Sequence, residues 1–239
     1  MKKLWMSVIA MTGILLAPKP EAAFGDYLFS QEYDTVQKGE FETDLYNNFN
    51  MPKSNKDNTY NSEHEVELEY GLTDHLQLAA YEVFTWDNSE NWQQDSLKAE
   101  TKYRFLESGK LPVDITLYGE YKNPNGSRDA HSDELEGRLI LSRDFGPWNV
   151  TGNLVAERKI NEHEDLQWEY DAGVSCAVKP QVRLGLEIRE TLRDSREFQL
   201  MPMIAANLTP HVRVLFGPAF GLTRAADDIQ LNSITEIEF

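Results

Sequence analysis

The chain has 239 residues, of which 41% are apolar and 11% aromatic, and its formal net charge is −17. So large an acidic excess opposes nucleic-acid binding, which draws on clustered lysine and arginine. The single cysteine, Cys176, excludes an intramolecular disulfide. Beyond the N-terminus no apolar run approaches the ~20 residues that a spanning helix requires, so insertion into a membrane as helices is excluded. The length suits one all-β domain.

The N-terminus predicts a secretory signal peptide. Lys2 and Lys3 precede an apolar stretch over residues 4–17, and small residues follow up to Ala23. This order of a basic, an apolar and a small-residue region is typical of such peptides. We place the signal peptide at residues 1–23, because the apolar stretch is too short for an anchor helix.

Residues 24–39 contain Tyr27, Phe29 and Tyr33 but no clear strand pattern. They could enter or cap a lumen as a partial plug, or they could form a periplasmic tail. We favour the tail, because chain ends that are not tied down are usually loose.

From Glu40 to Phe239 the sequence has about twelve segments in which apolar residues fall at every second position. In the second of them, for example, Val66 and Leu68 alternate with Glu65 and Glu67. Such alternation predicts strands with one apolar and one polar face. The expected strands lie at about 40–49, 63–70, 75–86, 97–105, 113–121, 134–141, 148–156, 166–176, 182–188, 198–208, 212–222 and 229–239.

Short turns and longer polar loops connect these strands alternately. The longer connections lie near residues 50–62, 87–95, 122–133, 159–165, 190–196 and 223–228. This pattern is typical of the periplasmic turns and extracellular loops of bacterial outer-membrane barrels, and an even strand count leaves both chain ends in the periplasm. We therefore predict an all-β fold, an antiparallel up-and-down transmembrane β-barrel of about twelve strands over residues 40–239.

Three strands fit this pattern poorly, and we leave their registers open. Both faces of the strand near residues 75–86 are apolar, and Glu82 would face lipid if the register of Leu76 held, which favours a bulge there. Pro202 and Pro218 each remove a hydrogen-bond donor from a ladder, which is awkward in a barrel without edges.

The last strand resembles the C-terminal signal that outer-membrane barrels present to their assembly machinery, since it ends on Phe239 after alternating apolar residues. This resemblance implies the outer membrane of a Gram-negative cell, with its lipid and lipopolysaccharide, and the Bam machinery as a transient partner. The phrases at residues 69–78 and 102–105 are similar to the group of barrels that includes the MetA-pathway phenol-degradation proteins. The suggested role of that group is to move aromatic compounds, but the resemblance identifies no substrate-binding residue in this chain.

If the apolar faces meet lipid, the opposite faces line the lumen. Acidic candidates gather on the first, second and last strands, which become neighbours when the barrel closes, whereas basic candidates lie mainly on the other strands. Charge would then be separated across the interior. The expected lumen-lining residues are Glu40, Glu42, Asp44, Glu63, Glu65, Glu67, Glu69, Lys98, Lys102, Arg104, Arg138, Arg183, Arg189, Arg213, Glu236 and Glu238.

Such an interior allows three interpretations. It could be packed with ion pairs and water, or it could be a narrow channel whose carboxylates favour cations and whose basic groups orient solutes. A site for a divalent cation is the least favoured, because no compact loop with calcium-ligand spacing is present, so we expect no metal and no cofactor. We prefer a non-enzymatic channel or transport-assisting barrel for a small solute, with a closed structural or surface-interaction barrel as the alternative.

Three polar residues raise the hypothesis that the protein is an enzyme. Ser62 and His64 share a face, and Asn47 on the preceding strand could lie beside them. The set resembles that of the outer-membrane phospholipases, but the order is Ser-x-His instead of His-x-Ser and the surrounding motif is missing. We therefore interpret these residues as part of a polar rim and expect no enzyme.

Overall fold

The computed structural model describes residues 25–51, 61–87, 92–124, 132–160, 166–192 and 196–239, which form twelve strands and no helix. None of these residues belongs to a helix long and apolar enough to cross a membrane. The strands are β1 Phe41–Met51, β2 Asn61–Thr73, β3 Leu76–Asp87, β4 Trp92–Arg104, β5 Asp114–Pro124, β6 Glu134–Phe145, β7 Trp148–Lys159, β8 Gln167–Lys179, β9 Val182–Thr191, β10 Glu197–Thr209, β11 Val212–Gly221 and β12 Ile229–Glu238.

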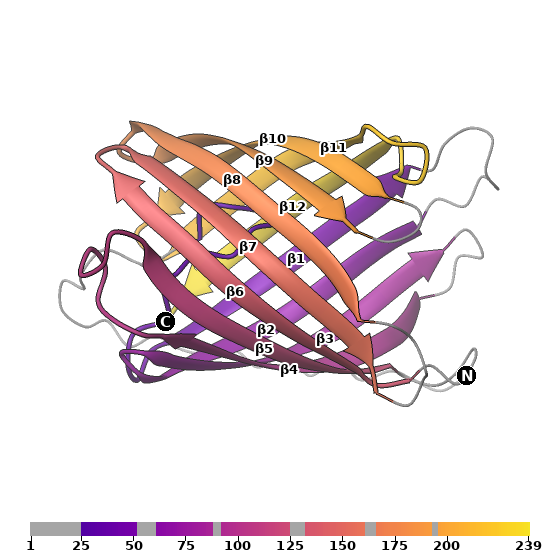
Figure 1. Cartoon of the computed structure of the whole chain (residues 1–239), viewed down its shortest axis with the longest axis horizontal. Helices are drawn as coiled ribbons and strands as arrows, with labels where there is room; N and C mark the ends of the chain where they lie inside the picture. The colour runs from indigo at the N-terminus through magenta and orange to yellow at the C-terminus, as the bar shows by residue number, and fades with distance from the viewer. Residues whose placement is uncertain (1–24, 52–60, 88–91, 125–131, 161–165, 193–195) are drawn as a thin grey trace.

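The strands form one closed antiparallel barrel (Figure 1). Each strand pairs with its neighbours in sequence, and β1 pairs with β12 to complete the ring. The predicted twelve-stranded up-and-down barrel is thus confirmed. We call the end where β2 passes into β3 the turn end, at the left of Figure 1, and the end where β1 stops and β2 begins the loop end.

The outer face of the barrel is apolar because side chains alternate along each strand. On β2, for example, Val66 and Leu68 are 45% and 51% exposed, whereas Glu67 between them is fully buried. A shift by one residue would put a whole row of carboxylates on the apolar outer face, so the pattern specifies the register strongly.

The bulge expected in β3 does not turn Glu82 inward. The pairing of β2 with β3 runs without a shift from Ser62↔Trp86 to Gly71↔Gln77, and Glu82 lies exposed on the outer face. A register shift does occur where β3 pairs with β4, but it lies beyond Glu82: Val83 pairs with Ser96 and Phe84 with Gln94, so the extra residue belongs to β4. The expected bulge at Glu82 in β3 was wrong, because unbroken backbone pairing around one polar residue outweighs the cost of placing that residue on the outer face.

Pro202 of β10 and Pro218 of β11 lie opposite each other. The pairs Leu200↔Phe220 and Ile204↔Phe216 have the same register on either side of them. Their other partners, Leu186 on β9 and Leu231 on β12, are retained. In an antiparallel ladder, the N–H of each residue points toward only one of the two adjacent strands. The two missing N–H groups therefore face each other between β10 and β11, and the ladders with β9 and β12 keep their donors.

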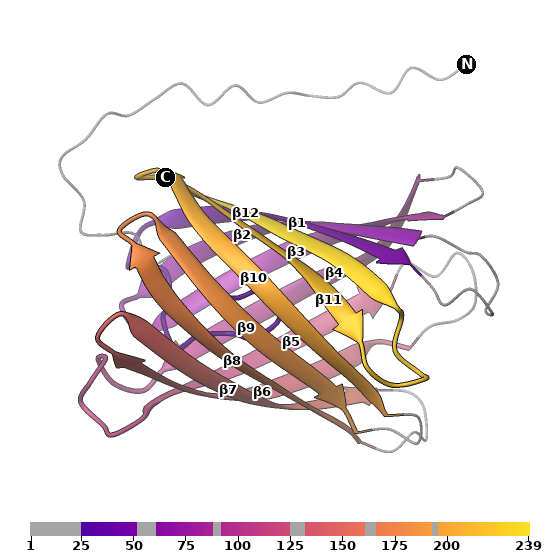
Figure 2. The same ribbon diagram turned by 90° about the horizontal axis from the view of Figure 1, so that it is seen from above.

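Residues 25–39, here called the inner segment, lie inside the barrel in the half near the turn end, as the indigo trace shows in Figures 1 and 2. Lys38 forms a bridge with Gly71 of β2, and Thr116 Oγ1 on β5 donates to the Tyr33 carbonyl at 2.7 Å. The favoured interpretation as a loose tail was therefore wrong for these residues. Inward polar side chains satisfy the backbone of the segment, so it is tied down along its length.

Two features of the wall make room for the inner segment. Gly173 on β8 lies against the ring of Tyr27, where an added Cβ would come within 2.4 Å of Tyr27 Cε1. The inward faces of β10 to β12 are apolar in part, and Leu28 and Phe29 of the segment pack against them. The apolar wall residues in these clusters are Met201, Met203, Ala205, Leu215, Ala219 and Ile234.

We predict that Gly173→Ala loosens the inner segment, because overpacking of this kind costs ~1–3 kcal/mol. Limited proteolysis of the folded barrel, with cut sites mapped by mass spectrometry, should show faster cleavage within residues 25–39. Gly152→Ala on β7 is the matched control, since no atom of the described ranges lies within 4 Å of its added Cβ. Equal cleavage rates in the two variants would contradict the observed contact.

Candidate functional site

Two cavities lie in the lumen, one on each side of the inner segment. The outer cavity, about 260 Å³, lies toward the loop end and is lined by Glu63, Glu65 and Lys98 among others. The inner cavity, about 70 Å³, lies toward the turn end and is lined by residues such as Glu42 and Glu236. Leu28 and Gln31 line both cavities. The inner segment is therefore the floor of the outer cavity.

The basic groups of the outer cavity are held by carboxylates on the same strand or on strands close by. Lys98 Nζ on β4 lies 2.9 Å from Glu65 Oε2 on β2, with β3 between the two strands. Arg138 Nη2 on β6 lies 3.0 Å from Glu136 Oε1, and its guanidinium also stacks on the ring of Tyr118, with 5.4 Å between Cζ and the ring centroid. These contacts fix positive and negative charge side by side on the cavity wall.

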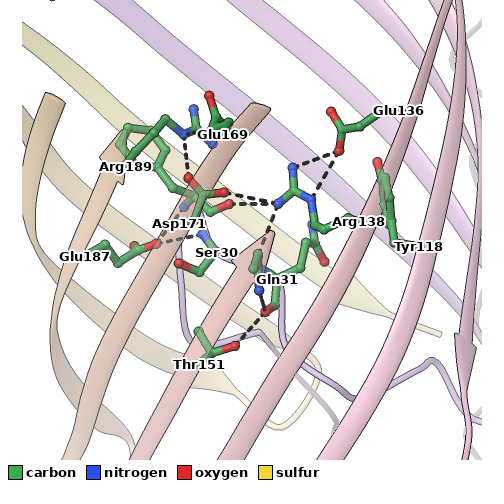
Figure 3. A network of polar contacts seen from close by, with 12 residues as sticks. Ser30, Gln31, Tyr118, Glu136, Arg138, Thr151, Glu169, Asp171, Glu187 and Arg189 are labelled. Carbon is green, nitrogen blue, oxygen red and sulfur yellow. Dashed lines mark hydrogen bonds and ion pairs between the residues drawn. The ribbon is translucent and has the colours of Figure 1, made fainter. Parts of the chain in front are cut away.

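Asp171 of β8 joins two of the arginines, as Figure 3 shows. Its Oδ2 lies 3.4 Å from Arg138 Nη1, and its Oδ1 lies 3.0 Å from Arg189 Nε. The same arginines hold the inner segment: Arg138 Nη1 donates to the Phe29 carbonyl at 3.4 Å, and the Arg189 guanidinium lies 4.0 Å from the centre of the Phe29 ring. The network thus links the cavity wall to its floor.

Glu187 on β9 is the principal anchor of the inner segment. Its carboxylate accepts hydrogen bonds from the backbone amides of Leu28 at 2.8 Å, Phe29 at 2.9 Å and Ser30 at 2.8 Å. Successive amides that converge on one anion form a favourable concave site. Asn153 supports the next residue by accepting from Gln31 N at 2.6 Å. Glu187 was not among the residues predicted from the sequence, although the alternating pattern of its strand indicates an inward position.

The start of the inner segment carries its own charges. Asp26 binds Arg183 Nε at 2.6 Å and also pairs with Arg213. The amide of Asp26 donates to Glu32 Oε2 at 2.7 Å. Burial, and then the nearby charges of Asp26 and Asp34, raise the pKa of Glu32 well above its usual range. Burial and neighbouring negative charge therefore favour the neutral form of this carboxyl.

Carboxylates dominate the wall of the inner cavity where β12, β1 and β2 meet. Asp44 of β1 lies opposite Glu236 of β12 on one side and opposite Glu67 of β2 on the other. Tyr46 Oη lies 2.9 Å from Glu67 Oε2 and 3.3 Å from Asp44 Oδ2, and its single proton can be donated to one of these oxygens at a time. Lys102 is the only basic residue among the described residues that line the cavity. This wall can receive a cation far more readily than an anion.

The other lumen candidates divide between the cavities and the turn end. Glu63, Glu65, Lys98, Arg138 and Arg189 line the outer cavity, and Glu42, Asp44, Glu69, Lys102 and Glu236 line the inner one. Glu67 is buried in the wall between them, and Arg183 and Arg213 hold Asp26. Arg104 contacts Asp34 and Glu107 near the turn end, where Glu40 precedes β1 and Glu238 ends β12.

Charge is separated across the lumen less completely than the sequence suggests. The carboxylates of β12, β1 and β2 do form one wall, but most basic groups pair with acids close to them. Arg138 and Arg189, for instance, share Asp171. The uncompensated part of the acidic wall is therefore concentrated around the inner cavity.

Ser62, His64 and Asn47 lie together on the outer face near the loop end. His64 Nε2 lies 3.0 Å from Ser62 Oγ, and His64 Nδ1 lies 2.8 Å from Asn47 Oδ1. The rings of Phe49 and Trp92 flank the imidazole, with centroids 5.5 Å and 4.9 Å away. In this arrangement Ser62 has the position of a nucleophile, His64 that of its base, and Asn47 that of the group that orients the base. Ser62 itself is only 4% exposed.

Solved structures share this fold. The KdgM porin matches with a TM-score of 0.60 at 7% identity, over 83% of this chain and 99% of that one. The KdgM porin in complex with disordered oligogalacturonate matches with a TM-score of 0.57 at 8% identity, over 83% and 98%. The NanC porin matches with a TM-score of 0.57 at 10% identity, over 82% and 98%.

No protein-family model and no curated protein matches the sequence. At such low identity the likeness to solved structures shows the fold alone. The chain has the barrel fold that these porins share.

We predict that Glu187→Ala releases the middle of the inner segment. Three backbone amides lose a charged acceptor, and hydrogen bonds to charged groups are worth ~1.5–3 kcal/mol each. Hydrogen exchange at residues 28–30 should become much faster in the variant. Glu190→Ala is the matched control, because Glu190 of the same strand pairs with Tyr170 instead of the inner segment. Unchanged exchange in Glu187→Ala would show that other contacts hold the segment.

Proposed function

We propose that this protein is an outer-membrane channel for small solutes, with a charged lumen that the inner segment constricts. The observation that carries the proposal is the outer cavity of about 260 Å³, whose wall presents four carboxylates and three basic groups to one water-accessible space. Neighbouring charges of both signs can replace the hydration shell of a polar solute, and a carboxylate excess favours cations. The fold shared with the KdgM and NanC porins supports this proposal.

The proposal includes a location. The signal peptide predicted at residues 1–23 and the terminal Phe239 favour export and assembly by the Bam machinery, and the apolar outer face suits lipid and lipopolysaccharide. The turn end would then face the periplasm and the loop end the cell exterior. Membership of the MetA-pathway group stays a prediction from sequence, as does passage of aromatic compounds.

The inner segment decides between a channel and a closed barrel. Tyr27, Phe29 and Tyr33 are buried inside the lumen, at 4%, 8% and 6% exposure. A solute that passes must move around these side chains or displace them. We infer that conductance of the intact chain is small and increases when the anchors of the segment are removed.

Planar-bilayer recordings of the purified, folded mature chain test this function. We expect discrete conductance steps that grow with salt concentration and prefer cations, with larger steps in Glu187→Ala than in the wild type. Glu190→Ala should conduct as the wild type does. If all three proteins fold, as heat-dependent gel mobility would show, and all remain silent, the closed structural barrel is the correct alternative.

The contacts of Ser62, His64 and Asn47 favour a second candidate function, hydrolysis of a lipid ester at the outer wall. With Nδ1 donating to Asn47, Nε2 can accept the proton of Ser62 Oγ as that oxygen attacks an acyl carbon. His64 then passes the proton to the leaving alcohol, and water releases the acid from Ser62. The low exposure of Ser62 makes this the weaker of the two functions.

A phospholipid-release assay with the folded barrel in mixed micelles tests the second function. We expect Ser62→Ala to abolish release of fatty acid, since loss of a nucleophile removes the acyl intermediate, and Ser132→Ala to leave it unchanged. Release that is absent in the wild type, or that persists in Ser62→Ala, would end the hydrolase hypothesis.

A further inference from the structure

The closing seam of the barrel brings like charges together. In the ladders, Glu42 pairs with Glu69 on one side, and Asp44 pairs with Glu236 and Glu67 on its two sides. Directly opposite side chains have Cβ atoms only ~4.5–5.5 Å apart, and like charges in such pairs repel. Potential ligand oxygens of Glu42, Asp44 and Glu236 all lie within 4.8 Å of one another.

These carboxylates are buried, and several of their oxygens lack a partner. Asp44 is 6%, Glu67 0% and Glu236 4% exposed. The Tyr46 hydroxyl lies beside one oxygen of Asp44 and one of Glu67, but Asp44 Oδ1, Glu67 Oε1 and Glu236 Oε2 have no hydrogen-bond partner among the described residues. A buried carboxylate oxygen without a partner is costly, because its hydration is lost and nothing replaces it.

The protein supplies little positive charge at this place. Six carboxylates and one ammonium group are among the described residues that line the inner cavity. The ammonium, Lys102 Nζ, contacts Gln31 Oε1 at 3.4 Å. Arg213 is engaged by Asp26, and its Nε lies 4.0 Å from Glu236 Oε2. The charge of the cluster is therefore far from balanced by the side chains around it.

The inner cavity leaves space for an ion with part of its hydration shell. Its volume of about 70 Å³ lies directly against Glu42, Asp44 and Glu236. A single water needs about 10–15 Å³ of such space. All available ligands are oxygens, which suit hard cations, and Ca²⁺ tolerates irregular sets of carboxylates and waters better than Mg²⁺ does.

We propose that Glu42, Asp44 and Glu236 bind one divalent cation, Ca²⁺ in preference to Mg²⁺, in the inner cavity. Glu236 comes from the last strand and the other two from the first, so the cation cross-links the seam at which the barrel closes. Gly25 lies next to the site, where an added Cβ would be 2.9 Å from Glu236 Oε1. Occupancy of the site therefore also favours docking of the inner segment.

Sequence spacing could not reveal this site. The ligands are separated by almost the whole barrel in sequence, so they form no compact loop of the kind that identifies calcium sites. Closure of the ring brings them together.

Calorimetric titration of the folded, metal-stripped mature chain with CaCl₂ at neutral pH tests the proposal. We expect one strong site per barrel, with weaker binding of MgCl₂, and a melting temperature that rises with Ca²⁺ and falls with EDTA. Asp44→Asn and Glu236→Gln should each weaken binding by at least about tenfold, since loss of even supporting groups costs 10–100-fold. Both variants remove like-charge repulsion and should fold.

Glu120→Gln, which lies in the outer cavity beside Tyr118, is the matched control and should bind Ca²⁺ as the wild type does. No binding by the folded wild type would overturn the proposal and indicate that the carboxyls hold protons instead. Binding that is equally strong in Asp44→Asn and Glu236→Gln would overturn it as well, because the ion would then lie elsewhere.

Discussion

Closure of the strand ring is the constraint on which this structure depends. In hydrocarbon, an unpaired backbone N–H or C=O costs several kcal/mol, so a spanning sheet cannot leave an edge. Pairing of β1 with β12, from Glu42↔Glu238 to Met51↔Ile229, removes that edge. The same pairing fixes which side chains meet across the seam. The crowding of carboxylates on β12, β1 and β2 is thus a direct result of the way the barrel closes.

The backbone N–H and C=O groups of the inner segment also need hydrogen-bond partners, and they find them in a different way. It has almost no ladder of its own, so its amides and carbonyls bind inward side chains. Glu187 accepts from three successive amides, Asn153 from a fourth, and Thr116 donates to a carbonyl. Polar groups of the lumen therefore replace water around irregular backbone. This explains why so many inward residues are charged or carry amides even where a cavity is absent.

The sequence predicted most of the wall because alternation is a local property. Strand positions, closure and the inward placement of rows such as Glu63 to Glu69 follow from the period of two. The inner segment could not be placed in this way, because its partners lie far away in sequence: Glu187 is 159 residues from Leu28. The sequence does contain one signal for the inner segment. Met201 and Leu215 make the inward faces of β10 and β11 apolar, and an apolar patch inside a polar lumen indicates that something packs there.

The sites were harder to predict than the wall, since they depend on register between strands. Alternation identified Asp44 and Glu236 as lumen residues, but only their pairing makes them neighbours with unpartnered oxygens. Ser62, His64 and Asn47 were identified together because two of them are close in sequence, whereas the distances that give them a chemical order required the structure.

The facing prolines Pro202 and Pro218 weaken the hydrogen bonding between β10 and β11. Between Leu200↔Phe220 and Ile204↔Phe216 the β10–β11 seam has two residues that cannot donate, so this line resists lateral separation less than the other seams do. Mechanical strain on the wall, from bilayer thinning or from a bulky object in the bore, is expected to part the strands here first. The separation would start beside the apolar patch against which Leu28 packs.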